Sequence, residues 1–526
     1  MIESFGDEYR PIYLVLFAFV AGLSLFPILP LQSLMAGHGT EVQAVAIVLL
    51  LLLMGGGMAL PALHAQRQFH QQIAQGNPER QLVSGDAGTG LVASPHLVVL
   101  TVYREPLQLI ALTVRSLADQ PEASRIVLAI GIEEDAPERD AKLASLQSLY
   151  LHSFLQLILI VHPRQMPAEV AGKCSNLNYT ARAAIEALEL GGIDLSRATI
   201  TGCDADTVFA PDYFQVLEAE MLRHRDHPAQ LIWQATLHYG WGRQGMPAIT
   251  TITGALRSLW IRGLLVPLSI NGMSVFSVDL GLYRRGNCTS PSHQMEDILS
   301  TIRWSLITGK RWMIKPLPTS LLCGPTSGGN AWEHFQEWRL QMRRWSLGAA
   351  EVFAYALYHR RRSSLPAMQF ASWCVLFFSY YFLLQCAAPL ALGSALLGSI
   401  VAQGRSWLSL TSAIPWPLQL PWPLQLPLGS GLVVVGLGGL AVITSLLADA
   451  MASLERSVSQ RSVAATQSSA KPYWFGRLLP WPMVVLLQAL IVLEALAAVA
   501  LRGKSICVHN PSEKRHLSTA ILWPAR

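Results

Sequence analysis

Charged residues are scarce in this chain. Of its 526 residues, only 14% are Asp, Glu, Lys or Arg, whereas 51% are hydrophobic. This balance excludes an ordinary soluble protein of the same length and indicates a membrane protein. The net charge of +5 forms no basic stripe interleaved with aromatic side chains, so we predict no nucleic-acid partner.

Cysteine is also scarce, and its pattern argues against two kinds of site. The seven cysteines form no CxxC pair and no even framework. We therefore expect neither a zinc site nor a disulfide scaffold, and we interpret the cysteines as reduced thiols.

Long hydrophobic runs, by contrast, are present near both ends of the chain. They cover residues 11–35, 42–63, 367–401, 428–448 and 478–501. A helix needs about 20 apolar residues to cross a bilayer. Because the run 367–401 is long enough for a pair of helices broken around Pro389, we expect about six spans. Glu494 in the last run is interpreted as a carboxylate that snorkels to the membrane surface.

The block between these runs has charges spread throughout, as in a soluble domain. Arg360, Arg361 and Arg362 directly precede the third span. Cytoplasmic loops carry an excess of basic residues, which places the central block and the N-terminus in the cytosol. We therefore predict an integral multi-pass protein of the plasma membrane or an internal membrane. The predicted parts are two N-terminal spans (1–66), a cytosolic domain (94–350), a C-terminal membrane region (366–502) with a Pro-rich linker (415–427), and a short tail (503–526).

Within the central block, continuous apolar runs alternate with segments of helical periodicity. The runs predict buried strands at 97–102, 125–132, 155–161 and 198–203, and the periodic segments predict helices at 106–118 and 176–190. This alternation is typical of a doubly wound α/β sheet, in which ligands gather at the carboxyl ends of the strands.

Residues 332–358 place aromatic and apolar side chains three or four positions apart. This spacing predicts an amphipathic helix that lies on the membrane surface. We expect Trp332, Phe335 and Trp338 to act only as core or interfacial anchors.

Asp204 and Asp206 stand two residues apart at the end of the last predicted strand. Side chains at i and i+2 of a strand share a side, an arrangement suited to a divalent cation bound to a diphosphate. An isolated Asp-x-Asp is more often a pair of solvated loop acids, so its context decides.

That context is a series of segments that resemble family 2 glycosyltransferases. Residues 99–106 (VLTVYREP) resemble the family's opening strand, residues 172–178 (GKCSNLN) its Gly-Lys element, and residues 204–206 (DAD) its metal-binding triplet. Residues 295–297 (MED) resemble its Thr-Glu-Asp motif with Met295 in place of threonine, and residues 341–345 (QMRRW) match the Gln-x-x-Arg-Trp of membrane-embedded synthases. The resemblance covers residues 97–345 and extends to the cellulose, chitin and hyaluronan synthases. It implies a GT-A-like doubly wound mixed sheet inserted between transmembrane helices.

The resemblance also implies roles for individual residues. Asp297 is expected to be the base that deprotonates the acceptor, although without the other motifs it would be an ordinary first-turn acid of a helix. A metal ion, Mg²⁺ or Mn²⁺, is expected at Asp204 and Asp206, where it would offset charge on the leaving diphosphate. The expected nucleotide contacts are Tyr103, Glu105, Glu134, Asp135 and Lys173, and the expected diphosphate and acceptor contacts are Glu296, Gln341, Arg344 and Trp345.

The predicted function is inverting, metal-dependent transfer of a sugar from a nucleotide sugar, in processive synthesis of a β-linked polysaccharide. The expected donor is a UDP-sugar, with a GDP-sugar as the other option, because the acids of residues 131–135 do not align with the family's single base-binding aspartate. One alternative is a single transfer to a lipid acceptor. Another is a membrane scaffold that has lost the chemistry.

Overall fold

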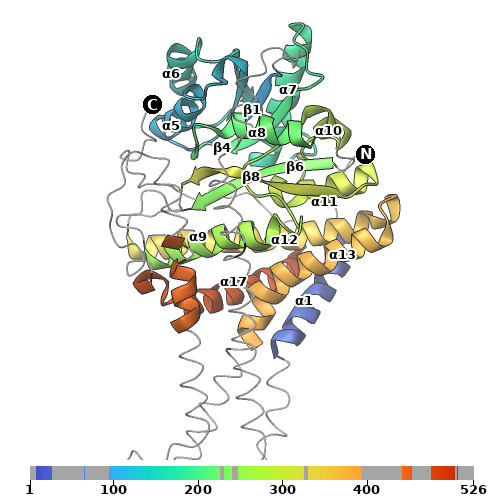
Figure 1. The fold of residues 1–526 in the computed structure, drawn as a ribbon. Coiled ribbons are helices and arrows are strands. Elements are labelled where there is room, and N and C mark those ends of the chain that lie inside the picture. Colours follow the sequence, from blue (N-terminus) through green and yellow to red (C-terminus); the bar gives the residue numbers. More distant parts are fainter. Residues whose placement is uncertain are drawn as a thin grey trace, which may run out of the picture.

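The computed structural model describes residues 7–25, 64, 94–164, 166–224, 230–239, 247–324, 330–391, 393, 441–449, 451–452, 475–503 and 506. In this part of the chain, a mixed sheet surrounded by short helices lies on a layer of longer helices (Figure 1). The predicted span 42–63, the linker 415–427, most of the span 428–448 and most of the tail 503–526 lie outside the described residues.

Within the described residues, the sheet has eight strands in the order β3-β2-β1-β4-β7-β6-β8-β5. They are β1 (His96–Val102), β2 (Ile126–Glu133), β3 (Gln156–His162), β4 (Thr199–Asp204), β5 (Thr207–Phe209), β6 (Gln230–Tyr239), β7 (Phe276–Asp279) and β8 (Trp312–Cys323). β1 runs parallel to β2 and β4, whereas β7 is antiparallel to β4 and β6. The prediction of an α/β fold with a mixed sheet is therefore confirmed.

Pairing between the first strands brings their carboxyl ends together. Thr101 of β1 lies between Gly131 of β2 and Asp204 of β4. All seven residues of β1 are buried, because the strand is covered on both faces. Ligands of such sheets bind at these strand ends.

The predicted burial of the strand at 155–161 was wrong, although the strand itself is present as β3. β3 was expected to be buried, but among the described strands it lies at the edge of the sheet and pairs only with β2. Val161 on it is 38% exposed and the preceding Leu155 is 47% exposed. An apolar run predicts a strand, but only the topology decides whether the strand has one neighbour or two.

Helices cover both faces of the sheet. They are α5 (Leu107–Ala118), α6 (Arg139–Tyr150), α7 (Lys173–Leu190), α8 (Tyr213–Arg223), α9 (Ala248–Trp260), α10 (Leu280–Arg285) and α11 (Glu296–Thr308). The predicted helices 106–118 and 176–190 are thus confirmed as α5 and α7. α7 approaches β2 so closely that a Cβ atom on Gly131 would collide with Asn176 and Thr180.

The predicted amphipathic helix is present as α12 (Ala331–His359). The side chain of Asn330 caps its N-terminus by accepting hydrogen bonds from the backbone N–H groups of Trp332 and Glu333. Part of its apolar stripe is buried against other helices, because Trp338 is 1% exposed and its indole N–H donates to Thr253 on α9. Trp332, at the free end of the stripe, is 64% exposed. Its expected place on a membrane surface stays a prediction.

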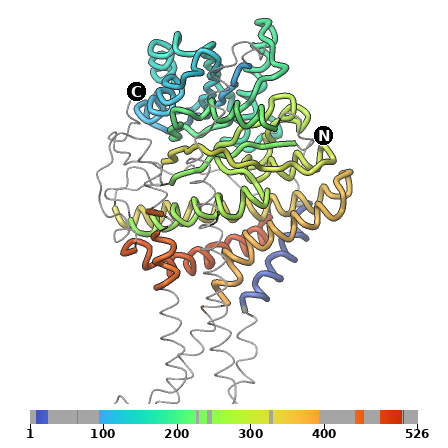
Figure 2. The backbone as a smooth tube through the Cα atoms, viewed as in Figure 1, coloured from blue at the N-terminus to red at the C-terminus, as the bar shows by residue number. Residues whose placement is uncertain are grey.

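Below α12 lie apolar helices from both ends of the chain: α1 (Arg10–Leu25), α13 (Ala367–Phe378) and α17 (Trp481–Arg502). Figure 2 shows α1 and α17 side by side although they are far apart in sequence. In the described residues, two helices are long and apolar enough to cross a membrane, Ala367–Ala391 and Phe475–Arg502. The carboxylate of Glu494 on α17 pairs with Arg339 and Arg343 of α12, at 3.5 and 3.1 Å.

The predicted break at Pro389 is not found. The helix that begins with α13 continues through the π-helical segment η5 (Ser379–Ala387) to Ala391. A proline inside a helix removes a backbone hydrogen bond and crowds the preceding turn. The wider π-helical turns directly before Pro389 are a known way for a helix to adjust locally without breaking.

Candidate active site

A cavity of about 650 Å³ opens at the carboxyl ends of β1, β2 and β4. Its wall contains nearly every residue that the sequence singled out: Tyr103, Glu105, Asp135, Lys173, Asp204, Asp206, Glu296, Asp297, Gln341, Arg344 and Trp345. Glu134 is not part of the wall, because its carboxylate turns to accept a hydrogen bond from the backbone of Arg164. Residues nearly 250 positions apart in sequence thus meet in one cavity.

The loop after β1 forms one side of this cavity. The backbone N–H of Tyr103 donates to the carboxylate of Glu105 at 2.8 Å, and the Arg104 guanidinium lies over the Tyr103 ring. α5 starts directly after Pro106, so this short turn is fixed between a buried strand and a helix.

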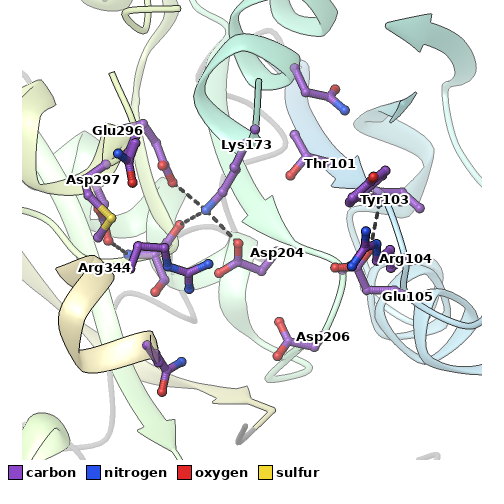
Figure 3. Close-up of a pocket in the computed structure, with 18 of the residues that line it drawn as sticks. Thr101, Tyr103, Arg104, Glu105, Lys173, Asp204, Asp206, Glu296, Asp297 and Arg344 are labelled. Atoms are coloured by element: carbon purple, nitrogen blue, oxygen red, sulfur yellow. Dashed lines mark hydrogen bonds and ion pairs between the residues drawn. The ribbon is translucent and has the colours of Figure 1, made fainter. Parts of the chain in front are cut away.

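Lys173 lies at the centre of the site and joins three segments (Figure 3). Its Nζ is 2.8 Å from Asp204 and 2.5 Å from Glu296, and it also donates to the backbone carbonyl of Ser274. Burial opposes the charge on Lys173, but Asp204, Glu296 and Asp297 outweigh it and hold the lysine pKa well above its usual value. The expected contact of Lys173 with the nucleotide stays a prediction; in the structure its ion pairs are with Asp204 and Glu296.

Glu296 and Asp297 begin α11 and are both 5% exposed. The two oxygens of Asp297 accept hydrogen bonds from the backbone N–H groups of Ser274 and Ile298, each at 2.8 Å. Burial raises the pKa of Glu296 to about 7, although Lys173 opposes the rise.

Ser274 was missed by the sequence reasoning. Its backbone is in the left-handed region, with φ of 43°, which is rare for a residue other than glycine. In this conformation its N–H contacts Asp297 and its carbonyl contacts Lys173. Such strain at a site of chemistry is typical of functional loops, but no sequence motif announces it.

Asp204 and Asp206, the residues expected to hold a metal ion, both line the cavity. Asp204 is the last residue of β4, and the more deeply buried Asp206 follows in the turn before β5. A Cβ atom on Gly324 would come within 2.6 Å of the Asp206 carboxylate. Any larger residue at position 324 would therefore displace this carboxylate.

The carboxylates of Asp204 and Asp206 fit a divalent cation that is held together with substrate phosphates. In the described residues, no group of three or more His, Cys, Asp or Glu side chains gathers as a metal cage. Mg²⁺ is commonly held by one or two carboxylates together with substrate phosphates, and two aspartates at the cavity wall fit that mode.

α12 forms the opposite wall with Gln341, Arg344 and Trp345. Burial lowers the pKa of Arg344; the neighbouring cation Arg257 adds to this, whereas Asp204, Glu296 and Asp297 oppose it. The Arg257 guanidinium itself lies 3.4 Å from the centre of the Trp345 ring.

A second group that the sequence did not reveal is centred on His162 at the end of β3. Its imidazole forms hydrogen bonds with the carboxylates of Glu133, at 2.8 Å, and Glu169, at 3.0 Å. The side-chain amide of Asn176 donates a hydrogen bond to the other oxygen of Glu133. Burial opposes the charged imidazole, but these two carboxylates raise the pKa of His162 to about 9. The group fastens the loop before Lys173 to the sheet.

Comparisons with known proteins give only distant likenesses. No family model and no curated protein sequence matches the chain. Among solved structures, it is similar to a mannosyltransferase, PcManGT from Pyrobaculum calidifontis in complex with GDP-Man and Mn²⁺, at 12% identity and a TM-score of 0.41. That match covers 84% of this chain and 99% of the other.

It is also similar to residues 1–349 of S. aureus TarS in complex with UDP-GlcNAc, at 12% identity and a TM-score of 0.29. This match covers 62% of this chain and 94% of the other. Identities and TM-scores this low carry no inference about the activity of the present chain.

Proposed function

We propose that the cavity is the active site of an inverting glycosyltransferase that uses a nucleotide-sugar donor. The observation that carries the proposal is the meeting, in one cavity, of an aspartate pair, a buried Glu-Asp pair and a half-buried arginine, Arg344. These are the groups that displacement of a nucleoside diphosphate requires: donors for its phosphates and a base for the attacking hydroxyl.

In this proposal the diphosphate of the donor lies between the aspartate pair and Arg344. Asp204 and Asp206 would hold Mg²⁺ or Mn²⁺, which when bound offsets negative charge on the phosphates. The Nε of Arg344 is buried, so the guanidinium would interact with phosphate in a medium that screens charge weakly. The nucleoside then extends toward Tyr103, Glu105 and Asp135.

Asp297 is proposed as the base. The backbone N–H groups of Ser274 and Ile298 fix its carboxylate at 2.8 Å, which orients it without a flexible partner. Asp297 takes the proton from the acceptor hydroxyl while the oxygen attacks the anomeric carbon from the face opposite the diphosphate. The bond to the diphosphate breaks as the new bond forms, so the configuration at the anomeric carbon inverts.

The acceptor is proposed to approach from the side of α12. A smaller cavity of about 80 Å³ shares Thr253, Arg257 and Trp345 with the large one and continues between α9, α12, η5 and α17. The aromatic and amide side chains of the smaller cavity favour binding of a sugar chain, and hence processive synthesis of a polysaccharide. These side chains are Trp260, Tyr380, Tyr381, Gln385 and Gln488. Its apolar side chains favour the second candidate, a lipid acceptor; they include Leu256, Met342, Val485 and Val492.

The two long apolar helices and the exposed apolar side chains on α1, α13 and α17 support insertion of the helical layer into a membrane. We propose a multi-pass protein with its sheet domain in the cytosol, as the arginines 360–362 suggest.

Transfer from a panel of radiolabelled UDP- and GDP-sugars, in purified membranes with Mn²⁺ or Mg²⁺, tests the proposal. One donor should label a product, and EDTA or Asp206→Asn should abolish it, whereas the exposed control Asp194→Asn should not. Label in a large polymer supports the polysaccharide, and label that partitions into organic solvent supports the lipid. If no donor is consumed, the proposal fails, and the hypothesis of a membrane scaffold without catalytic activity gains support.

A further inference from the structure

Arg257 stands at the junction of the two cavities and lines both of them. It belongs to α9, outside every motif that the sequence revealed. Its guanidinium stacks on Trp345 at 3.4 Å and lies 5.2 Å from the ring centre of Tyr239.

The guanidinium of Arg257 has no anionic partner in the part of the chain that the structure describes. No carboxylate forms an ion pair with it, and its Nε is buried without a hydrogen-bond acceptor. A guanidinium carries five N–H donors, and leaving a buried donor unmatched is costly. A cation–π contact uses only the face of the group, so its edge stays available for an oxyanion.

A second cation lies close by. Arg344 is also half-buried, and it lies close enough to Arg257 for the charge of Arg257 to lower the pKa of Arg344. The two differ in their surroundings, because Arg344 faces Asp204, Glu296 and Asp297, whereas Arg257 extends to the smaller cavity. The edge of a guanidinium suits an oxyanion such as phosphate, so each of the two arginines can bind a phosphate group of its own.

The side of the site on which Arg257 lies indicates the source of this phosphate. Among the described residues that line the smaller cavity there is no Asp, Glu or Lys, and this part of the wall is mainly apolar. The diphosphate of the donor belongs, in the proposed function, to the Arg344 side.

We propose that Arg257 binds the phosphate group of a lipid acceptor, whose first apolar carbons enter the smaller cavity. This inference rests on the proposed function and selects the lipid among its two acceptor classes. Stacking on Trp345 holds the guanidinium in place, and its edge then fixes the phosphate beside the path to the anomeric carbon.

Binding measurements on the full-length protein in lipid nanodiscs test this inference. The probes are dihexanoyl phosphatidate and dihexanoylglycerol, which differ only by the phosphate, and the nucleotides UDP and GDP with Mn²⁺. The variants are Arg257→Gln, which removes the charge, and Arg257→Lys, which keeps the charge but loses the planar fork. Arg139→Gln, at a half-buried arginine on α6 that lines neither cavity, is the matched control.

Arg257→Gln should weaken phosphatidate binding at least about tenfold, with Arg257→Lys in between, because a charge-assisted hydrogen bond is worth more than 1.4 kcal/mol. Binding of dihexanoylglycerol and of the nucleotides should change less than about twofold. Retained nucleotide binding also shows that the variants are folded.

Two results would overturn the inference. If the Arg257 variants bind nucleotide more weakly but bind phosphatidate as the wild type does, Arg257 belongs to the donor site. If their affinity for every probe is unchanged, Arg257 is only a packing residue. If the wild type binds phosphatidate through Arg257 but no nucleotide, the proposed transfer fails while the phosphate site stands.

Discussion

Replacement of His162 by glutamine should change how the stability of the protein depends on pH. His162 is almost fully buried between Glu133 and Glu169, and its pKa rises from 6.5 to about 9. In the unfolded chain the imidazole loses its proton near pH 6.5, whereas in the folded protein it keeps the proton to about pH 9. The stabilisation is therefore fully present below pH 6.5 and is lost as the pH rises through about 9.

The magnitude follows from the two pKa values. Each factor of ten in proton affinity corresponds to about 1.4 kcal/mol, so the rise from 6.5 to about 9 corresponds to about 3.4 kcal/mol. Between these pH values the free energy of unfolding of the wild type should fall by about 1.4 kcal/mol for each pH unit, relative to a variant that cannot titrate there.

Denaturant titrations of the purified protein at several pH values between 6 and 9.5, followed by tryptophan fluorescence, measure this difference. His162→Gln should remove the extra slope, whereas His152→Gln, at an exposed position, should keep it. Parallel curves for the wild type and His162→Gln would refute the reasoning, because they would show that the imidazole is not held charged by its two carboxylates.

Two further substitutions test other parts of the site. Lys173→Met should lower the free energy of unfolding at pH 8 by about 3–5 kcal/mol, because it removes the cation that pairs with the buried Glu296 and with Asp204. Denaturant titration against the exposed Lys310→Met measures this, and an unchanged midpoint would show that the Lys173 ion pairs contribute nothing. Gly324→Ala should weaken Mn²⁺-dependent nucleotide binding about tenfold by displacing the Asp206 carboxylate, as calorimetry can check. The control is Gly22→Ala, where a Cβ meets nothing within 4 Å, and equal affinity for both variants would contradict the assigned place of Asp206.

Much of the sheet and of the cavity wall was predictable because the signals are local. An apolar run that ends in polar residues identifies a strand and its carboxyl end, as at β1 and β4, and parallel pairing then brings those ends together. The position of Asp204 at the end of β4 followed directly from this rule.

What the sequence could not supply depends on contacts between distant segments. The left-handed backbone at Ser274 matters only because Lys173 and Asp297 lie on either side of it. Arg257 looks like any helical arginine until α12 places Trp345 against it. Likewise, no periodicity in β3 distinguishes an edge strand from a central one.

The central claim is that Asp297 acts as the base in sugar transfer within this cavity. Its most direct test is the turnover of the preferred donor, with nucleotide affinity measured in parallel, for the wild type, Asp297→Asn and the exposed control Asp140→Asn. Loss of a positioned base should lower turnover by about 10²–10⁴-fold while nucleotide affinity and the control stay within about twofold. Turnover by Asp297→Asn at the wild-type rate would contradict the account, as would a wild-type protein that binds nucleotide but consumes no donor.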